Sequence, residues 1–164
     1  MAERHDGAFR TAVAFVTHTR EYRSSEVLPS LARHGYTTTE RPHDRETERL
    51  LVQFDPDLVV LAYGTNESGD DDQPIEVYER ELRRVVTRVQ SAVPTSSCLL
   101  VGPSDRPIVH RDGTYEQRPR TQQVIDAQRR VALDYGCGFF DLVAFGGGPA
   151  HMMAWAEAEP AWAQ

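Results

Sequence analysis

Lysine is missing from the 164 residues, so all 18 side chains counted as lysine or arginine are arginine. Acidic residues outnumber them, at 25, and the formal net charge is −7 at pH 7. Binding to nucleic acid needs a basic face, and this charge balance argues against it. The sequence has no apolar run long enough to span a membrane, and residues 1–10 show no signal-peptide pattern. We therefore expect neither a nucleic-acid nor a membrane partner, and the compartment stays open.

Cysteine is scarce as well. Cys98 and Cys137 are too few for a disulfide framework or a cysteine-based metal site. Such residues are most often buried free thiols that behave as small hydrophobic side chains, and we expect that state for both. The Gly-x-Gly-x-x-Gly turn after a first strand and the Walker pattern are also missing, which disfavours an unrelated nucleotide-binding domain. We expect no metal and no cofactor.

The most informative stretch is a continuous apolar run at residues 58–62, which follows Asp-Pro and precedes Gly64. Such a run is typical of a strand buried on both faces at the centre of a parallel sheet. Other stretches predict strands at 11–16, 36–39, 98–103 and 139–142. Helices are predicted from Ser24 or Ser25 to Gly35, after a cap at Asp44, around 78–89, from a cap at Thr121 to Gly136, and over 150–158.

Strands that alternate with helices through short links predict the α/β class. The length suits a single domain over residues 1–164 with helices on both faces of a sheet. The expected architecture is a three-layer αβα sandwich with a mainly parallel, flavodoxin-like sheet.

The carboxyl end of a central parallel strand opens onto the crevice where α/β proteins keep their chemistry. Here that end reads Gly64-Thr65-Asn66-Glu67. Gly64 permits a sharp turn, after which Asn66 offers its side-chain amide to the crevice. The alternative is that Asn66 only caps the turn by bonding nearby backbone, as asparagine often does in turns.

The stretch Asp57 to Glu67, DLVVLAYGTNE, resembles the third conserved block of the SGNH (GDSL) hydrolases, whose signature there is Gly-x-Asn-Asp. Glu67 replaces the last Asp, as in a branch similar to bacterial peptidoglycan and carbohydrate O-acetylesterases. The resemblance continues through 98–107 and 127–142 to Trp155. It implies an ester hydrolase acting on an acylated carbohydrate or small molecule. It also implies these roles: Asn66 as oxyanion donor, Gly64 as the turn that places it, and Thr65 and Glu67 as substrate-binding residues.

Two blocks of that family have no counterpart in this sequence. Gly-Asp-Ser, which supplies the nucleophile after the first strand, does not occur, and residues 16–19 read Val-Thr-His-Thr. The Asp-x-x-His pair, expected a dozen or so residues after Trp155, is also missing. A hydroxyl without a base is a poor nucleophile near neutral pH. We therefore expect a chain that is incomplete at its C-terminus or catalytically impaired. The alternative is a non-catalytic descendant that binds a glycan or a protein.

Other polar residues are weaker candidates for chemistry. Two substitute sets are Thr17 or Thr19 beside His18, and Ser104, Asp105 and His110 in one loop. Residues 70–72 are typical of a solvated helix start, and His151 is expected on the surface of a first helical turn. Met152, Met153 and Trp155 are expected in the core or in a lid. A sheet without its final helix would expose an apolar patch beside residues 139–142, which predicts self-association.

Overall fold

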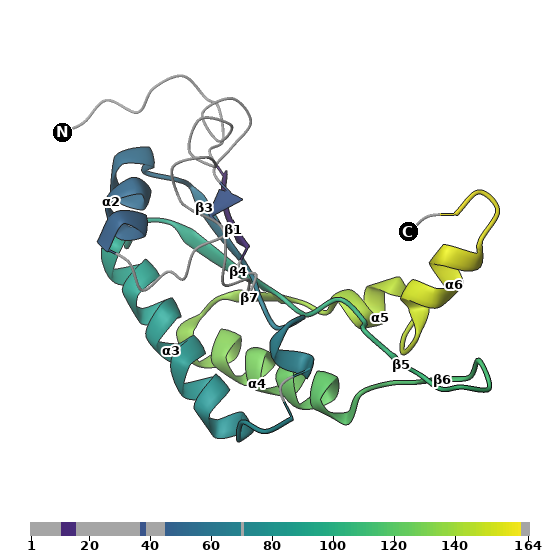
Figure 1. The fold of residues 1–164 in the computed structure, drawn as a ribbon. Coiled ribbons are helices and arrows are strands. Elements are labelled where there is room, and N and C mark those ends of the chain that lie inside the picture. Colours follow the sequence, from purple (N-terminus) through teal and green to yellow (C-terminus); the bar gives the residue numbers. More distant parts are fainter. Residues whose placement is uncertain (1–10, 16–36, 39–44, 70, 162–164) are drawn as a thin grey trace.

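The computed structural model describes residues 11–15, 37–38, 45–69 and 71–161, and Figure 1 labels its elements. The strands are β1 (Thr11–Phe15), β2 (Thr37–Thr38), β3 (Leu58–Ala62), β4 (Ser97–Val101), β5 (Ile108–Val109), β6 (Tyr115–Glu116) and β7 (Gly138–Phe140). The helices are α2 (Arg45–Phe54), the short 3-10 helix η1 (Glu67–Gly69), α3 (Ile75–Ala92), α4 (Pro119–Tyr135), α5 (Leu142–Gly146) and α6 (His151–Glu157). The predicted helix between Ser24 and Gly35 and the predicted cap at Asp44 lie outside the described residues.

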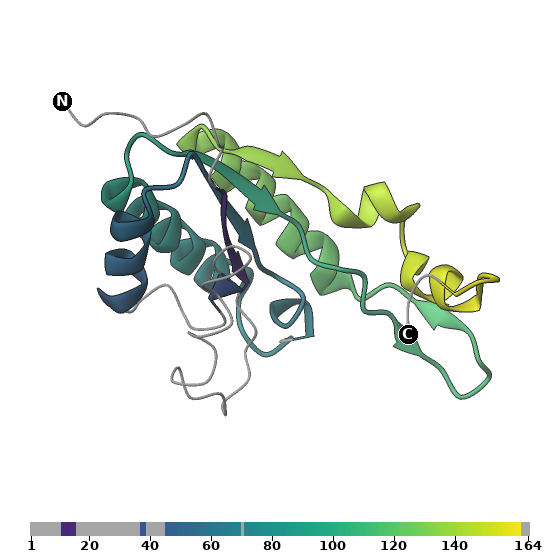
Figure 2. The same ribbon diagram turned by 90° about the horizontal axis from the view of Figure 1, so that it is seen from above.

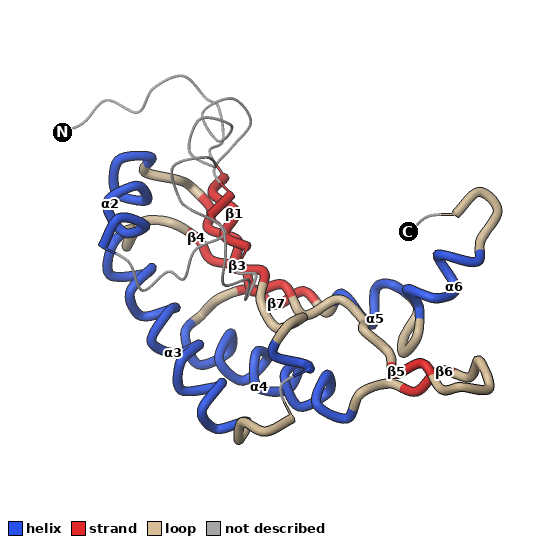
Figure 3. The backbone as a smooth tube through the Cα atoms, viewed as in Figure 1, coloured by secondary structure: helices blue, strands red, loops and turns tan. Residues whose placement is uncertain are grey.

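Five strands form one sheet in the order β2-β1-β3-β4-β7, and every pair in it is parallel. This is the flavodoxin-like order, in which the chain reverses direction across the sheet between its first and third strands. The central strand is β3, where Val60 lies opposite Val13 of β1 and Leu99 of β4. The α/β prediction is therefore confirmed: a parallel sheet is flanked by helices, as in a three-layer α/β fold (Figure 3).

One face of the sheet packs against helices α2, α3 and α4, which lie side by side (Figure 1). In β3 the alternate residues Val59 and Leu61 are fully buried, because alternate side chains of a strand point to the same face. They belong to one core cluster with apolar side chains of the helices, such as Val86 of α3 and Val124 of α4. The apolar three-to-four spacing of both helices is explained by this contact.

Several element boundaries differ from the sequence prediction. Helix α4 begins at Pro119 rather than at a Thr121 cap, because proline is well suited to a first helical position. Strand β7 ends at Phe140, and the Asp141 carboxylate then caps α5 by accepting the Ala144 N–H at 2.9 Å. The predicted loop between β4 and α4 also contains the antiparallel hairpin of β5 and β6. The two-residue strands of this hairpin and the five-residue helix α5 carry too little periodicity to be found from sequence.

The expectation of two free thiols is wrong, because Cys98 and Cys137 form a disulfide. Cys98 lies in β4, and Cys137 lies directly before β7. The two strands pair in parallel with Leu99 opposite Gly138, so the residues one position earlier are also neighbours. Their Cα atoms are 4.8 Å apart, within the range that a disulfide bridges. Sequence spacing did not show this pairing, since 39 positions separate the cysteines.

The hairpin of β5 and β6 lies together with α5 and α6 beyond the carboxyl ends of the strands (Figure 2). The Tyr115 hydroxyl of the hairpin donates to the Glu157 carboxylate of α6 at 3.1 Å. Within the described ranges, no helix has the length and apolar character needed to cross a membrane.

Candidate active site

The chain turns sharply after β3 at Gly64, whose φ is +106°. Glycine adopts such an angle without the steric penalty that a Cβ atom brings. The turn is also crowded, because a Cβ at this position would lie 2.7 Å from Cγ1 of Val124 and 3.2 Å from Nε2 of Gln128. Only glycine fits here without displacing helix α4.

Residues on both sides of Asn66 hold the turn in shape. The Gly64 N–H donates to the Glu67 carboxylate at 3.2 Å. The Ser68 hydroxyl donates to the Gly64 carbonyl at 2.7 Å, and the Ser68 N–H donates to the same oxygen at 2.8 Å. The segment from Gly64 to Ser68 is therefore closed on itself by three short-range hydrogen bonds.

A second set of bonds ties this loop to the loop after β4. The Ser104 N–H donates to the Thr65 hydroxyl oxygen at 3.0 Å, and the two side-chain hydroxyls lie 3.1 Å apart. Because β3 and β4 are neighbours in register, their carboxyl ends meet at the same edge of the sheet. Thr65 therefore links the two loops directly beside Asn66.

Helix α4 supports the loop from beneath through Gln128 and Arg120, both buried. The Gln128 amide donates to the Tyr63 carbonyl and to the Tyr78 hydroxyl, each at 2.9 Å. The Arg120 side chain donates to the Glu67 carbonyl at 3.4 Å. The sequence analysis did not single out Gln128 or find these bonds. A polar residue on an apolar helix stripe was the available signal.

The two tyrosines beside Gln128 are neutral phenols. Burial raises the pKa of the Tyr63 hydroxyl far above its ordinary value, and the nearby Tyr78 and Glu67 raise it further. Burial also raises the pKa of Tyr78, with Glu67 as the second cause. Gln128 and the two tyrosines are therefore uncharged, and Arg120 is the charged member of the support.

Asn66 lies on this braced loop at the carboxyl edge of the sheet, and it is partly exposed. Its carbonyl accepts the Gly69 N–H at 2.9 Å, which fixes its backbone at the start of η1. Within the described residues its carboxamide makes no hydrogen bond. A donor held in this way can meet a developing negative charge without reorganisation of the backbone.

The substitute set of Ser104, Asp105 and His110 is not assembled as the sequence suggested. His110 is exposed on the hairpin and lies 3.1 Å from the Glu116 carboxylate. The imidazole near Asp105 is instead that of His151, with 3.9 Å between Nδ1 and Oδ2. The expectation of a surface position for His151 is wrong, because its side chain is 2% exposed. Its ring is enclosed by Gly146, Gly148 and Trp155.

The remaining candidates add no second site. Residues 17–19 and Asp70 lie outside the described part of the chain, while Asp71 and Asp72 are exposed. In α6, Met152, Met153 and Trp155 are partly buried. No group of three or more His, Cys, Asp or Glu side chains among the described residues is placed to hold a metal ion.

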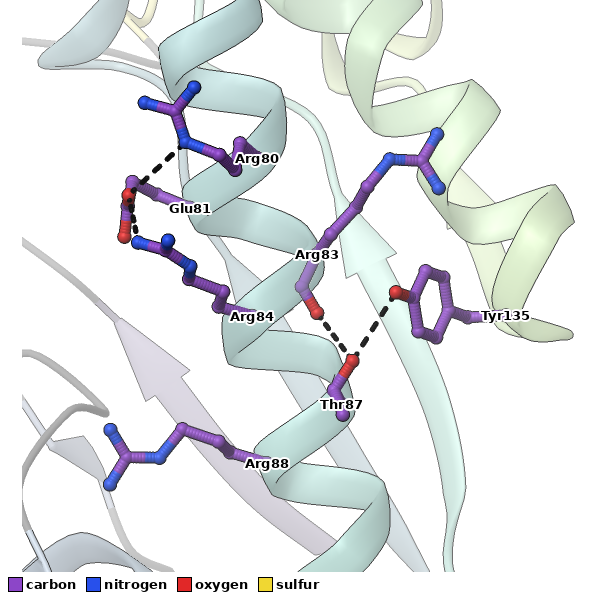
Figure 4. A pocket seen from close by; sticks show the side chains of 7 residues that line it. All are labelled: Arg80, Glu81, Arg83, Arg84, Thr87, Arg88 and Tyr135. Carbon is purple, nitrogen blue, oxygen red and sulfur yellow. Dashed lines mark hydrogen bonds and ion pairs between the residues drawn. The ribbon is translucent and has the colours of Figure 1, made fainter.

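An open pocket of about 530 Å³ lies elsewhere, on the outer side of α3 (Figure 4). Its walls are Arg80, Glu81, Arg83, Arg84, Thr87, Arg88 and Tyr135. The arginines have carboxylate neighbours: Arg83 binds Glu79 and Asp134, Arg84 binds Glu81, and Arg88 binds Glu48. None of the residues predicted for the site lines this pocket, and its positive charge is largely compensated.

Solved structures with a similar fold include several esterases. A peptidoglycan O-acetylesterase is 28% identical, with a TM-score of 0.60 over 68% of this chain. This chain spans only 32% of the length of that protein.

The acetyl xylan esterase AlAXEase is 16% identical, with a TM-score of 0.52 over 80% of this chain and 77% of its own. The esterase EstA from Pseudoalteromonas sp. is 14% identical, with a TM-score of 0.51 over 92% of this chain and 82% of its own. At these identities the last two likenesses concern the fold alone. No curated protein matches the chain.

The family is decided by the sequence itself. A model of the GDSL-like lipase/acylhydrolase family matches residues 4–163, nearly the whole chain. The match includes the strand, the turn and the asparagine described above. This agrees with the SGNH (GDSL) resemblance found in the sequence, and the chain belongs to the GDSL-like lipase/acylhydrolase family.

Proposed function

We propose that this chain is a carbohydrate O-acetylesterase-like hydrolase domain in which the Asn66 amide donates to the oxyanion formed at the acyl carbonyl. The observation that carries the proposal is the bracing of the loop around Asn66, by Gln128 from α4 and by Ser104 from the loop after β4. A preorganised donor is worth more than a mobile one, because it does not reorganise when charge develops. The 28% identity to a peptidoglycan O-acetylesterase supports an acetylated glycan as the substrate class.

Gly64, Thr65 and Glu67 have supporting roles in this proposal. Gly64 provides the turn that places Asn66, as the family resemblance implied. The side chains of Thr65 and Glu67 both make hydrogen bonds that fix the loop. Direct contact of Thr65 or Glu67 with substrate stays a prediction.

Turnover by this chain is expected to be slow. The 164 residues contain neither Gly-Asp-Ser nor Asp-x-x-His, so the family's nucleophile and its base are not identified. An oxyanion donor alone supports only the residual rate that remains when a triad is broken. This observation favours a second candidate function, a non-catalytic domain that binds acetylated glycan through the same crevice.

One experiment tests binding and turnover separately. Acetylated xylo-oligosaccharide is added to the 15N-labelled protein, and the side-chain amide signals of Asn66 are followed by NMR. We expect these signals to shift with the acetylated sugar and not with its deacetylated form. The exposed Gln122 amide is the internal control. An Asn66 signal that is unmoved at saturating acetylated sugar contradicts the proposal.

Hydrolysis of p-nitrophenyl acetate then separates the two candidate functions. If turnover exceeds the buffer rate, Asn66→Ala is expected to lower it by about 10²–10³-fold, the effect of removing one oxyanion donor. Gln122→Ala should leave the rate unchanged. Binding without any turnover favours the non-catalytic domain, and turnover that is indifferent to Asn66 contradicts the assigned role.

Self-association also belongs to the proposal. Phe140 and Phe145 are exposed at the end of β7 and in α5, with ring centroids 5.2 Å apart. Exposed apolar patches often mark interaction surfaces. Sedimentation at increasing protein concentration measures whether this patch joins two copies, and replacement of both phenylalanines by glutamine is expected to weaken any association.

A further inference from the structure

Asp105 and His151 meet inside the protein although neither is part of the proposed oxyanion site. Asp105 follows β4 by four positions, and His151 is the first residue of α6. Their side chains are 0% and 2% exposed. The distance from Nδ1 of His151 to Oδ2 of Asp105 is 3.9 Å. Two ionisable groups so fully enclosed are uncommon unless they compensate each other.

The imidazole of His151 packs closely against the segment from Gly146 to Gly148. Its Nδ1 lies 2.9 Å from the Gly148 carbonyl, which only accepts hydrogen bonds, so Nδ1 carries a proton. A Cβ on Gly146 would overlap Cδ2 of the ring. The Trp155 ring packs edge-on against the imidazole, with centroids 5.0 Å apart. Gly146 therefore leaves a space that the histidine ring fills.

The carboxylate of Asp105 needs this neighbour. Neither of its oxygens has a hydrogen-bond partner among the described residues. A buried carboxylate without donors is strongly disfavoured, and a positive charge nearby relieves the cost. Nε2 of His151 is likewise buried without a partner and is the atom that gains a proton when the imidazole becomes charged.

Other charged groups nearby are directed elsewhere. On α6, the Glu157 carboxylate binds the Tyr115 hydroxyl of the hairpin. On the β4 side, Arg106 is exposed, and the Arg118 guanidinium donates to the Arg106 carbonyl at 3.1 Å. Asp105 is the one carboxylate in the described part of the chain within ion-pair distance of His151.

The pair lies next to a residue that is hydrogen-bonded to the loop of Asn66. Asp105 directly follows Ser104, whose N–H and hydroxyl hold the Thr65 side chain. Thr65 in turn precedes Asn66. A displacement of Asp105 would therefore be transmitted to Ser104, then through the two hydrogen bonds to Thr65, and from Thr65 to Asn66.

We propose that Asp105 and His151 are a positioning pair that docks α6 onto the loop after β4 and thereby holds Thr65 in place beside Asn66. Trp155 and Gly146 enclose the imidazole, which lies beside the Asp105 carboxylate. The link to catalysis rests on the proposed hydrolase function, whereas the docking itself does not.

Trp155 reports directly on the charge of His151, because imidazolium quenches the fluorescence of an adjacent indole. The Trp162→Phe background leaves Trp155 as the single tryptophan. We expect its emission to fall in one step as the pH is lowered and the imidazole gains a proton. His151→Gln should remove the step, and His110→Gln, the matched change at an exposed histidine, should retain it.

Asp105→Asn tests the coupling within the pair. Removal of the carboxylate withdraws the negative charge that lies nearest to the imidazole, so the midpoint of the step should move to lower pH. An unmoved midpoint overturns the pairing. A step that survives His151→Gln overturns the assignment of the reporter and the proposal with it.

Amide hydrogen exchange tests the link to the loop. The Ser104 amide is protected by its bond to Thr65. We expect Asp105→Asn and His151→Gln each to speed exchange at Ser104 at least tenfold, with no change in the His110→Gln control. Unchanged exchange at Ser104 overturns the positioning role. Neither measurement depends on ester turnover, so each can fail while the proposed hydrolase function stands.

Discussion

The side-chain amide of Gln128 lies 2.9 Å from the carbonyl oxygen of Tyr63, a residue 65 positions earlier in the chain. Tyr63 is the last residue before the Gly64 turn, so this bond fixes the exit of the central strand from inside the protein. The same Gln128 nitrogen also donates to the Tyr78 hydroxyl of α3. One buried amide thus joins β3, α3 and α4 at the point where the loop of Asn66 begins.

Replacing Gln128 by methionine keeps its length and removes both donated bonds. The Tyr63 carbonyl and Tyr78 hydroxyl are then left buried without this donor, and a buried polar group without a partner costs about 1–3 kcal/mol. We expect the free energy of unfolding to fall by about 2–4 kcal/mol in urea titrations. Gln122→Met, on the exposed face of the same helix, loses only its bond to Asp126 and should cost well under 1 kcal/mol.

Gly64→Ala is expected to destabilise the fold more than the same change at Gly113. Both glycines have positive φ, +106° and +83°, and an L-residue there costs about 1–2 kcal/mol. At Gly64 the new methyl group also overlaps Val124, whereas nothing lies within 4 Å at Gly113. Overpacking adds about 1–3 kcal/mol. Equal losses in thermal or urea unfolding would contradict the crowded turn.

The disulfide between Cys98 and Cys137 is expected to stabilise the protein through its closed loop. With 39 positions between the cysteines, the loop-entropy relation gives about 4 kcal/mol. Unfolding of the oxidised protein should therefore shift to lower urea when a reductant is added. The Cys98→Ala/Cys137→Ala double variant should unfold like the reduced protein and be indifferent to reductant. No shift on reduction would show that the thiols are not paired.

Glu79 is expected to make stability depend on pH. The hydrogen bond from Arg130 is the main cause that lowers the pKa of this carboxyl, and Arg83 adds to it. A carboxyl whose pKa is lower in the folded state stabilises the protein above the unfolded pKa, about 4.3. This contribution is lost as pH falls through the folded pKa.

Glu79→Gln should therefore be less stable than the parent at pH 7, with the difference shrinking below about pH 4. A partly exposed ion pair of this kind is worth about 1 kcal/mol or less. Glu76→Gln, an exposed change in the same helix, is the control. A Glu79→Gln difference that stays constant from pH 7 to pH 3 would contradict the role of the arginines.

The sequence predicted much of the fold because the relevant signals are local. An apolar run bounded by Asp-Pro and Gly identified β3, and apolar residues at three-to-four spacing identified α3 and α4. The family block around Asn66 is also contiguous in the chain, so the residues of the candidate site can be recognised from the sequence alone. Short elements such as β5, β6 and α5 were missed, because a few residues show no period.

Pairings between distant residues were decided only in three dimensions. His151 was expected on the surface and Cys98 was expected as a free thiol, since nothing in their neighbouring residues indicates a partner. The folded structure places His151, at the start of α6, beside Asp105, in the loop after β4. The register of β4 with β7 places Cys98 beside Cys137.

The amino-acid sequence by itself determined the parallel α/β class, the family and the place of Asn66 at the end of the central strand, because each follows from residues that are adjacent in the chain. The tertiary structure decided what holds that asparagine's loop: Gln128 beneath it, Ser104 beside it, and the buried Asp105 and His151 behind Ser104. Such contacts depend on the packing of whole elements, which places side chains within hydrogen-bond distance however far apart they are in sequence.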